Sequence, residues 1–291
     1  MASTKPTILI QLDTDPQPSV FDGVVAVDAG VDHLFRHGGV RPESVRDLVY
    51  GALFTRGPAD LGRTALFIGG SDVAAGEAVL ERVRQTFFAN FRVSVLLDSN
   101  GANTTAAAAV LAALEGSGGE LDGVAAAVLA ATGPVGQRVA RLLGRLGATV
   151  SVGSRDLDRA RATAEALQQA AGRPFTPFAS KDEDGLARAL ADVSVVVAAG
   201  AAGKPLLPES VRRGLTKLKV AIDLNAVPPL GIEGIAATDR DADRDGVRAW
   251  GALGVGAAKM KIHKRAIQEL FTANDKVLDA EEVLAIGRTS G

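Results

Sequence analysis

The segment Val128-Leu-Ala-Ala-Thr-Gly-Pro-Val-Gly136 decides the fold of the second half of the chain. It follows an apolar, strand-like run over 124–130 and opens a helical pattern over 135–146. Small residues at 131, 133 and 136 let the main chain approach a pyrophosphate, and the helix N-terminus adds a partial positive charge. We therefore predict a dinucleotide-binding turn formed by Thr132, Gly133, Pro134, Val135 and Gly136. The alternative is a tight strand–helix turn that binds nothing.

Strand and helix patterns alternate on both sides of this turn. Before it, the patterns predict strands at 7–12, 65–68 and 93–97 and helices at 19–27, 43–54, 73–88 and 104–114. After it, they predict strands at 149–152, 194–198 and 219–224 and helices at 157–171, 186–190, 256–271 and 279–286. Near-continuous Val, Ala and Leu runs are typical of parallel sheets buried on both faces. The predicted fold is α/β, with two parallel-sheet domains, the second Rossmann-like, and a cleft between them.

The Gly-rich, acidic stretch EGSGGELD at 115–122 separates two apolar segments and is the best linker candidate. At ~100–200 residues per domain, a chain of 291 residues predicts two domains. We expect a first domain over 1–118, a dinucleotide-binding domain over 119–250, and C-terminal helices over 251–291 that return to the first domain.

The composition excludes several classes of function. The chain has 32 Lys and Arg against 34 Asp and Glu, which gives no general reason to expect nucleic-acid binding. It has no cysteine, so disulfides, thiolate chemistry and Cys-ligated metals are excluded, and no metal site is expected. The apolar runs 106–114 and 124–131 are shorter than the ~20 residues of a spanning helix. Because the N-terminus also lacks a signal-peptide pattern, we expect a cytoplasmic protein without a membrane partner.

The strand after the glycine turn ends in Gly153-Ser-Arg-Asp156 and bears on coenzyme choice. NAD-selective sites usually place an acid here to bind the ribose, whereas Ser154 and Arg155 can bind a 2′-phosphate. We predict NADP, with NAD as the alternative because Asp156 is adjacent. Later strands end at 198–203 and 223–229, where ligands bind in open α/β sheets. These ends add Ala199, Gly200, Asp223 and Asn225 to the predicted coenzyme site, unless they are ordinary turns.

Four further segments carry a resemblance to a known family. They are QLDTDPQPSVFD (11–22), LDSNGANTTA (97–106), DLNAVPPLGI (223–232) and GALGVGAAKMKIH (251–263). Over roughly residues 8–286 the chain resembles the bacterial NADP-dependent methylene-tetrahydromethanopterin dehydrogenases. The resemblance implies a homo-oligomeric enzyme of one-carbon (formaldehyde) metabolism that forms methenyl-tetrahydromethanopterin by hydride transfer to NADP⁺. It also implies that 1–118 binds the pterin and 119–250 binds NADP.

The same resemblance implies the remaining site residues. Lys259 and His263, four residues apart on one helix face, would lie near the reacting carbon, and Phe21 would pack on the pterin. The predicted catalytic set is therefore Lys259, His263 and Phe21. The predicted substrate contacts are polar side chains that could match a pterin edge, namely Asp13, Asp22, Asp98, Asn100, Asn103 and Thr104. The alternatives are a core Phe, helix caps and a solvated basic helix face.

Two departures from the family pattern stand in the coenzyme segments. The family's G-T-G-P-V-G turn begins with Ala131 here, and the residue after Arg155 is acidic where the family carries Lys. The implied reaction needs no proton abstraction, because two nitrogen lone pairs stabilise the cation left behind. The protein then has to position the reactants and exclude water. Other hypotheses are a methylene-tetrahydrofolate or shikimate-type dehydrogenase and a non-catalytic dinucleotide-binding sensor.

Overall fold

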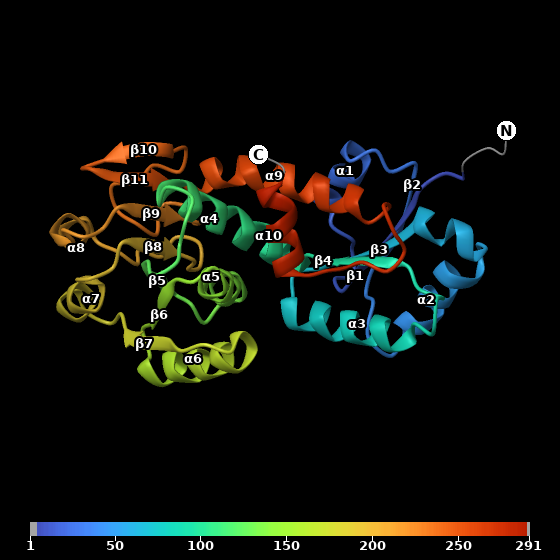
Figure 1. The fold of residues 1–291 in the computed structure, drawn as a ribbon, viewed down its shortest axis with the longest axis horizontal. Coiled ribbons are helices and arrows are strands. Elements are labelled where there is room, and N and C mark those ends of the chain that lie inside the picture. The colour runs from blue at the N-terminus through green and yellow to red at the C-terminus, as the bar shows by residue number, and fades with distance from the viewer. Residues whose placement is uncertain (1–4, 290–291) are drawn as a thin grey trace. The chain divides into compact units, whose positions relative to one another are not determined.

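The computed structural model describes residues 5–289, which divide into two compact units (Figure 1). Unit 1 holds the residues up to Thr104 and those from Met260 onward, and unit 2 is Thr105–Lys259. Both divisions fall inside helices, α4 (Ala102–Gly116) and α9 (Ala252–Glu269). The predicted linker at 115–122 instead forms the end of α4 and the turns after it. The Ala-rich α4 meets no helix breaker before its glycines, so it crosses the division unbroken.

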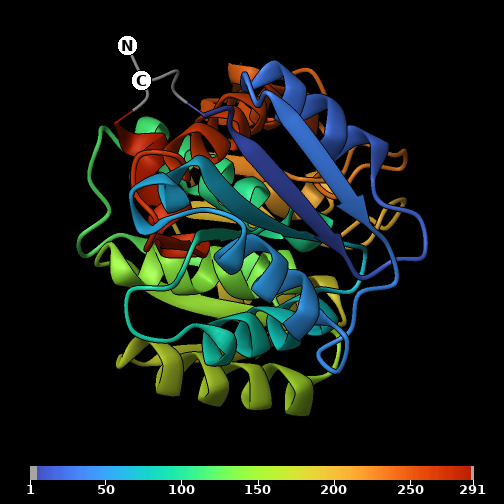
Figure 2. The ribbon, with the colours of Figure 1, turned by 90° about the vertical axis from the view of Figure 1, so that its right-hand side faces the viewer.

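Unit 1 contains a five-stranded, fully parallel sheet in the order β12-β4-β3-β1-β2. Its strands are β1 (Ile8–Asp13), β2 (His33–His37), β3 (Thr64–Gly69), β4 (Ser94–Leu97) and β12 (Val277–Leu278). Figure 2 shows β1 and β2 as neighbouring dark-blue and blue strands at one side of this sheet. The last strand arrives from the C-terminal part of the chain, where Val95 N donates to Lys276 O at 2.8 Å.

Helices cover both faces of the unit 1 sheet. Apolar side chains of α2 (Val45–Phe54) and α3 (Val73–Thr86) pack with Ile10, Leu66 and Val95 in one core. On the opposite face, His263 of α9 stacks on Phe67 of β3. The other helical segments of this unit are α1 (Val20–Asp28), α10 (Ala280–Arg288) and the short η1 (Pro58–Arg63) and η2 (Ser99–Gly101).

Unit 2 contains a seven-stranded sheet in the order β10-β11-β9-β8-β5-β6-β7. Its strands are β5 (Ala125–Leu129), β6 (Thr149–Ser154), β7 (Phe175–Ala179), β8 (Val195–Ala198), β9 (Val220–Asp223), β10 (Arg240–Arg244) and β11 (Val247–Trp250). Every pairing is parallel except the β10–β11 hairpin. The chain leaves β5 toward β6 and β7 and later returns on the other side through β8, so the strand order reverses between β5 and β8. Ligands bind at such a reversal in open α/β sheets.

The helices of unit 2 follow the same two-faced arrangement. Helix α5 (Pro134–Arg145) contacts β5 and β6, and α6 (Leu157–Ala171) contacts β6 and β7. Helices α7 (Glu183–Leu190) and α8 (Glu209–Gly214) share a buried core with alternate residues of β5, β8 and β9. The prediction of two parallel α/β sheets is confirmed. No helix within residues 5–289 is long and apolar enough to cross a membrane.

Several elements were missed or misplaced by the sequence patterns. Strands β2, β7, β10, β11 and β12 and helix α8 were not predicted. Helix α9 begins four residues earlier than expected, at Ala252 instead of 256. Gly254 lies in this added first turn, and only glycine fits there, because a Cβ would lie 2.0 Å from Asp239 O.

Candidate functional site

The turn between β5 and α5 has the geometry of a phosphate-binding turn. A Cβ at Gly136 would lie 2.8 Å from Ala131 Cα and 3.0 Å from Ala130 O, so only glycine fits there. At Gly133 the nearest atom to a Cβ would be 3.8 Å away, which leaves the outer side of the turn open. The first helical hydrogen bond is Gln137 N to Gly133 O, so the N–H groups of Val135 and Gly136 precede the hydrogen-bonded helix. These N–H groups are available to an anion at the helix N-terminus.

The strained residue of this turn is Ala130, one position before residue 131, where the family pattern has its first glycine. Ala130 has φ of +55°, a left-handed conformation that costs an L-residue ~1–2 kcal/mol. Ala131, which replaces the glycine, is 1% exposed and donates its N–H to Gly153 O at 3.0 Å. The methyl group at 131 is therefore turned into the protein, and the N–H groups of the turn are not covered by it.

A cavity of about 450 Å³ lies beside the turn, at the ends of β6 and β7. It is lined by Ala130, Thr132, Ser154, Arg155, Asp156, Arg159, Ser180, Lys181 and Leu206. Of the lining residues, Thr132, Ser154 and Arg155 were predicted, whereas Arg159, Ser180 and Lys181 were missed. The signal of Ser180 and Lys181 was weak because β7 contains Pro177, which hid the strand that ends just before Ser180.

The only carboxylate among the lining residues of this cavity is used by the protein itself. Asp156 Oδ1 accepts hydrogen bonds from the N–H groups of Asp158 at 2.9 Å and Arg159 at 3.3 Å, and so caps α6. Three cationic side chains face the same cavity. The lining therefore suits an anionic group better than a ribose hydroxyl that needs a carboxylate partner.

The loops after β8 and β9 complete this end of the unit 2 sheet. A Cβ at Gly200 would lie 2.7 Å from Leu206 and 3.5 Å from Ala130 Cβ, so the loop after β8 approaches the β5 turn. Asp223 accepts hydrogen bonds from Asn225 N at 3.0 Å and Ile232 N at 2.9 Å. Burial raises the pKa of Asp223, while these bonds oppose the rise. Asp223 and Asn225 thus shape the loop 225–232, and their contact with a coenzyme stays a prediction.

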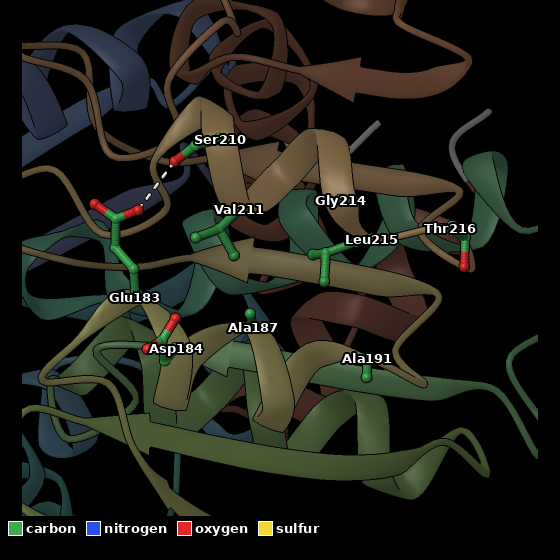
Figure 3. A pocket seen from close by; sticks show the side chains of 9 residues that line it. All are labelled: Glu183, Asp184, Ala187, Ala191, Ser210, Val211, Gly214, Leu215 and Thr216. Carbon is green, nitrogen blue, oxygen red and sulfur yellow. Dashed lines mark hydrogen bonds between the residues drawn. The ribbon is translucent and has the colours of Figure 1, made fainter.

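A second hollow in unit 2 lies between α7 and α8 (Figure 3). It measures about 330 Å³ and has an apolar floor of Ala187, Val211 and Leu215. At its acidic end Ser210 Oγ donates to Glu183 at 3.0 Å, and Asp184 lies beside them. None of the predicted site residues lines this hollow, whereas Thr132, Ser154 and Arg155 line the cavity at the strand ends.

In unit 1, two of the predicted substrate residues hold strand–helix turns. Asp13 is 0% exposed and accepts hydrogen bonds from Asp15 N at 3.0 Å, Ser19 N at 2.9 Å and the Gln11 amide at 3.2 Å. Asp98 accepts from Thr104 N at 3.0 Å and Thr104 Oγ1 at 2.7 Å. Both residues thus have the capping role that the sequence analysis gave as the alternative to substrate contact. Any substrate contact stays a prediction.

The two predicted amides of the β4 turn differ in exposure. Asn103 is buried and donates to Leu97 O at 2.6 Å and to Asp279 at 2.9 Å. Asn100 is exposed and has φ of +54°, and its main-chain N–H donates to Gly70 O. Asn100 is therefore the amide of this turn that can reach a ligand without rearrangement.

Three rings meet on the α9 face of unit 1. His263 is 1% exposed and stacks on Phe67, with 5.6 Å between ring centroids and 22° between ring planes. The Phe21 ring lies 6.4 Å from the same imidazole and is 52% exposed. The structure thus brings together the predicted Phe21 and His263, and it adds Phe67, which looked like an ordinary strand residue.

Asp22 lies beside these rings. A Cβ at Gly69 would lie 3.1 Å from the Phe67 ring, 3.2 Å from Asp13 and 3.5 Å from Asp22 Oδ2. Because glycine has no side chain, these three groups can pack near one another. Burial raises the pKa of the Asp22 carboxyl, the charge of His263 opposes the rise, and Asp98 adds to it.

The third predicted catalytic residue, Lys259, is half-buried on α9, one turn before His263, while Lys261 is exposed.

A mostly parallel α/β unit with a glycine turn at its strand-order reversal has the Rossmann-like fold that is typical of dinucleotide-binding proteins. The 5-ketofructose reductase of Gluconobacter sp. strain CHM43 has this fold, with a TM-score of 0.52, 15% identity and 99% of both chains covered. The N-terminal model of methylene-tetrahydromethanopterin dehydrogenases matches residues 20–100.

Two relatives from Methylorubrum extorquens align over nearly the whole chain. The "bifunctional protein MdtA" is 44% identical, with 97% of this chain and 98% of the relative covered. An "NAD(P)-dependent methylenetetrahydromethanopterin dehydrogenase" is 31% identical, with 92% of this chain and 93% of the relative covered. The chain therefore belongs to the methylene-tetrahydromethanopterin dehydrogenase family, which confirms the resemblance drawn from the motifs.

Proposed function

We propose that the protein oxidises methylene-tetrahydromethanopterin to the methenyl form and transfers the hydride to NADP⁺. The observation that carries this proposal is the alignment, over 92% of the chain, with a relative named for NAD(P)-dependent oxidation of this pterin. Unit 2 would bind the coenzyme, because it holds the glycine turn and the cation-lined cavity. Unit 1, with its polar strand ends and exposed Phe21, would bind the pterin.

The coenzyme, when bound, supplies the hydride acceptor, and the residues of unit 2 fit it. The N–H groups at the start of α5 would bind the pyrophosphate, and the absent side chain at Gly133 leaves room for it. Arg155, Arg159 and Lys181 would bind the 2′-phosphate. Asp156, which capping already engages, supports NADP over NAD. Ala199, Gly200, Asp223 and Asn225 would shape the nicotinamide side of the site.

On the substrate side, the protein has to hold a flat heterocycle and leave its reacting carbon accessible. Phe21 would pack on the pterin, and Asn100 and Asp22 would meet its polar edge. Lys259 and His263 would lie toward the reacting carbon from one face of α9. Because the reaction needs no general base, this arrangement works by positioning and by excluding water.

The test is an assay of the purified protein with two carriers and two coenzymes. Reduction of NADP⁺ by methylene-tetrahydromethanopterin is the expected result. Turnover with methylene-tetrahydrofolate alone would reject the carrier, and coenzyme binding without turnover on either carrier would favour a non-catalytic sensor.

Coenzyme choice has its own test in Arg155→Ala and Lys181→Ala. Each change should raise KM for NADP⁺ by about tenfold and leave KM for NAD⁺ nearly unchanged, because each removes one charge from a phosphate site. Arg161→Ala is the matched control, since Arg161 lies on α6 but does not line the cavity. Equal effects on both coenzymes would show that these side chains do not recognise the 2′-phosphate.

Assembly and location follow the same proposal. We propose that the protein is a homo-oligomer, as the family resemblance implies. We also propose that it is cytoplasmic, which the absence of cysteine supports. Light scattering of the purified protein tests the first, and cell fractionation tests the second.

A further inference from the structure

The group around His263 has the composition of a site for a flat, delocalised cation. Aromatic rings attract cations through their faces, and Phe21 and Phe67 both lie against the imidazole. Asp13 and Asp22 lie beside the Phe67 ring, since a Cβ at Gly69 would lie 3.1 Å from that ring, 3.2 Å from Asp13 and 3.5 Å from Asp22. Asp98 is near enough to raise the pKa of Asp22. These three carboxylates outnumber the two basic side chains, Lys259 and His263, that the proposed function places toward the reacting carbon.

Asp22 is the carboxylate of this group that retains acceptor capacity. Asp13 and Asp98 accept main-chain N–H bonds that hold their turns. Among residues 5–289, no main-chain N–H donates to the Asp22 carboxylate, while the N–H of Asp22 itself donates to Ser19 Oγ at 3.3 Å. Since burial raises the pKa of Asp22, its charge is poorly solvated and gains more than a solvent-exposed one from a nearby cation.

The proposed reaction creates such a cation. The C–H bond of the methylene carbon breaks with both electrons, the hydride reduces the oxidised nicotinamide coenzyme, and the substrate is left with a positive charge shared by the carbon and two nitrogens. Resting on the proposed function, we propose that the Asp22 carboxylate stabilises this charge and makes unit 1 bind the methenyl cation more tightly than the neutral methylene form. A residue that interacts more strongly with the product charge than with the substrate accelerates the oxidation.

The test compares the binding of the two pterins without coenzyme, because they differ by one charge and little in shape. Calorimetric titration of Asp22→Asn should show about tenfold weaker binding of methenyl-tetrahydromethanopterin and less than about threefold weaker binding of the methylene form. Asp28→Asn is the matched control, since Asp28 lies on the same helix α1 with an exposed side chain that pairs with Lys264. It should leave both affinities unchanged.

Two further results decide the inference. Asp22→Glu restores a carboxylate and should recover most of the preference for the cation. Equal weakening of both pterins by Asp22→Asn, or an unchanged preference, would overturn the proposed role while the proposed function stands. If the wild-type protein binds neither pterin, the proposed function itself fails, and the inference falls with it.

Discussion

The first strand–helix turns of the two units occupy equivalent places and are built in opposite ways. In unit 2, the turn between β5 and α5 consists of small residues and leaves N–H groups at the helix start open. In unit 1, the turn between β1 and α1 is filled by the buried Asp13, whose carboxylate accepts two of the turn's own N–H groups. The unit 1 turn thus holds an anion supplied by the protein itself, whereas the unit 2 turn leaves its N–H groups available to an external one.

The largest expected effect comes from removing the internal anion of unit 1. Asp13→Ala leaves the N–H groups of Asp15 and Ser19 and the Gln11 amide without their acceptor in a buried turn. We expect a loss of about 3 kcal/mol in the free energy of unfolding. Urea unfolding of the variant measures it.

An exposed acid provides the control for that experiment. Asp47 on α2 has a side chain that is 87% exposed, and Asp47→Ala should change stability by less than about 0.5 kcal/mol. A similarly small change for Asp13→Ala would mean that the unit 1 turn does not depend on its carboxylate.

The next effect concerns the glycines of unit 2. Gly136→Ala places a methyl against the main chain of Ala130 and Ala131, and we expect a loss of about 2 kcal/mol in stability together with weaker coenzyme binding. Gly133→Ala has room for its methyl within the protein, so it should retain stability and lose only coenzyme affinity. Thermal unfolding with and without NADP⁺ separates the two. If Gly133→Ala bound NADP⁺ as well as the wild type, the phosphates would not lie over this turn.

The smallest expected effect on stability concerns the φ angle of Ala130 in the unit 2 turn. Ala130→Gly relieves the left-handed strain at φ of +55° but makes the unfolded chain more flexible. The two contributions nearly offset, so we expect a gain of about 0.5 kcal/mol in stability with unchanged coenzyme affinity. Differential scanning calorimetry resolves a change of this size, and a clear destabilisation would contradict the conformation described for Ala130.

The glycine turn and the parallel sheets could be predicted from sequence because their requirements are local. Small residues between a strand and a helix indicate a tight turn that a phosphate can approach, and long apolar runs indicate burial on both faces. Strand β7 was missed because Pro177 interrupts its pattern, and β10 because Arg-Asp-Ala-Asp-Arg lacks apolar alternation. Both strands are stabilised by pairing with a neighbour, which a local pattern does not contain.

The candidate site was harder to predict, for a chemical reason. Asp13, Asp98 and Asp156 are residue types that suit ligand binding and helix capping equally well. Which role dominates depends on where the neighbouring N–H groups point, as the bonds from Ser19 to Asp13 and from Asp158 to Asp156 show. Phe67 and Lys181 could not be assigned at all, because each becomes significant only through a partner distant in sequence.

The strand β12 has a consequence for the order of biosynthesis. It lies at the edge of the unit 1 sheet beside β4, and Ser94 Oγ donates to Ala273 O at 3.0 Å, so the first unit is closed by the last part of the chain. While the ribosome is still translating the middle of the message, the emerging first hundred residues expose an open sheet edge. The continuous middle unit can complete its own sheet during that interval, and the N-terminal unit reaches its final form only when translation is nearly finished.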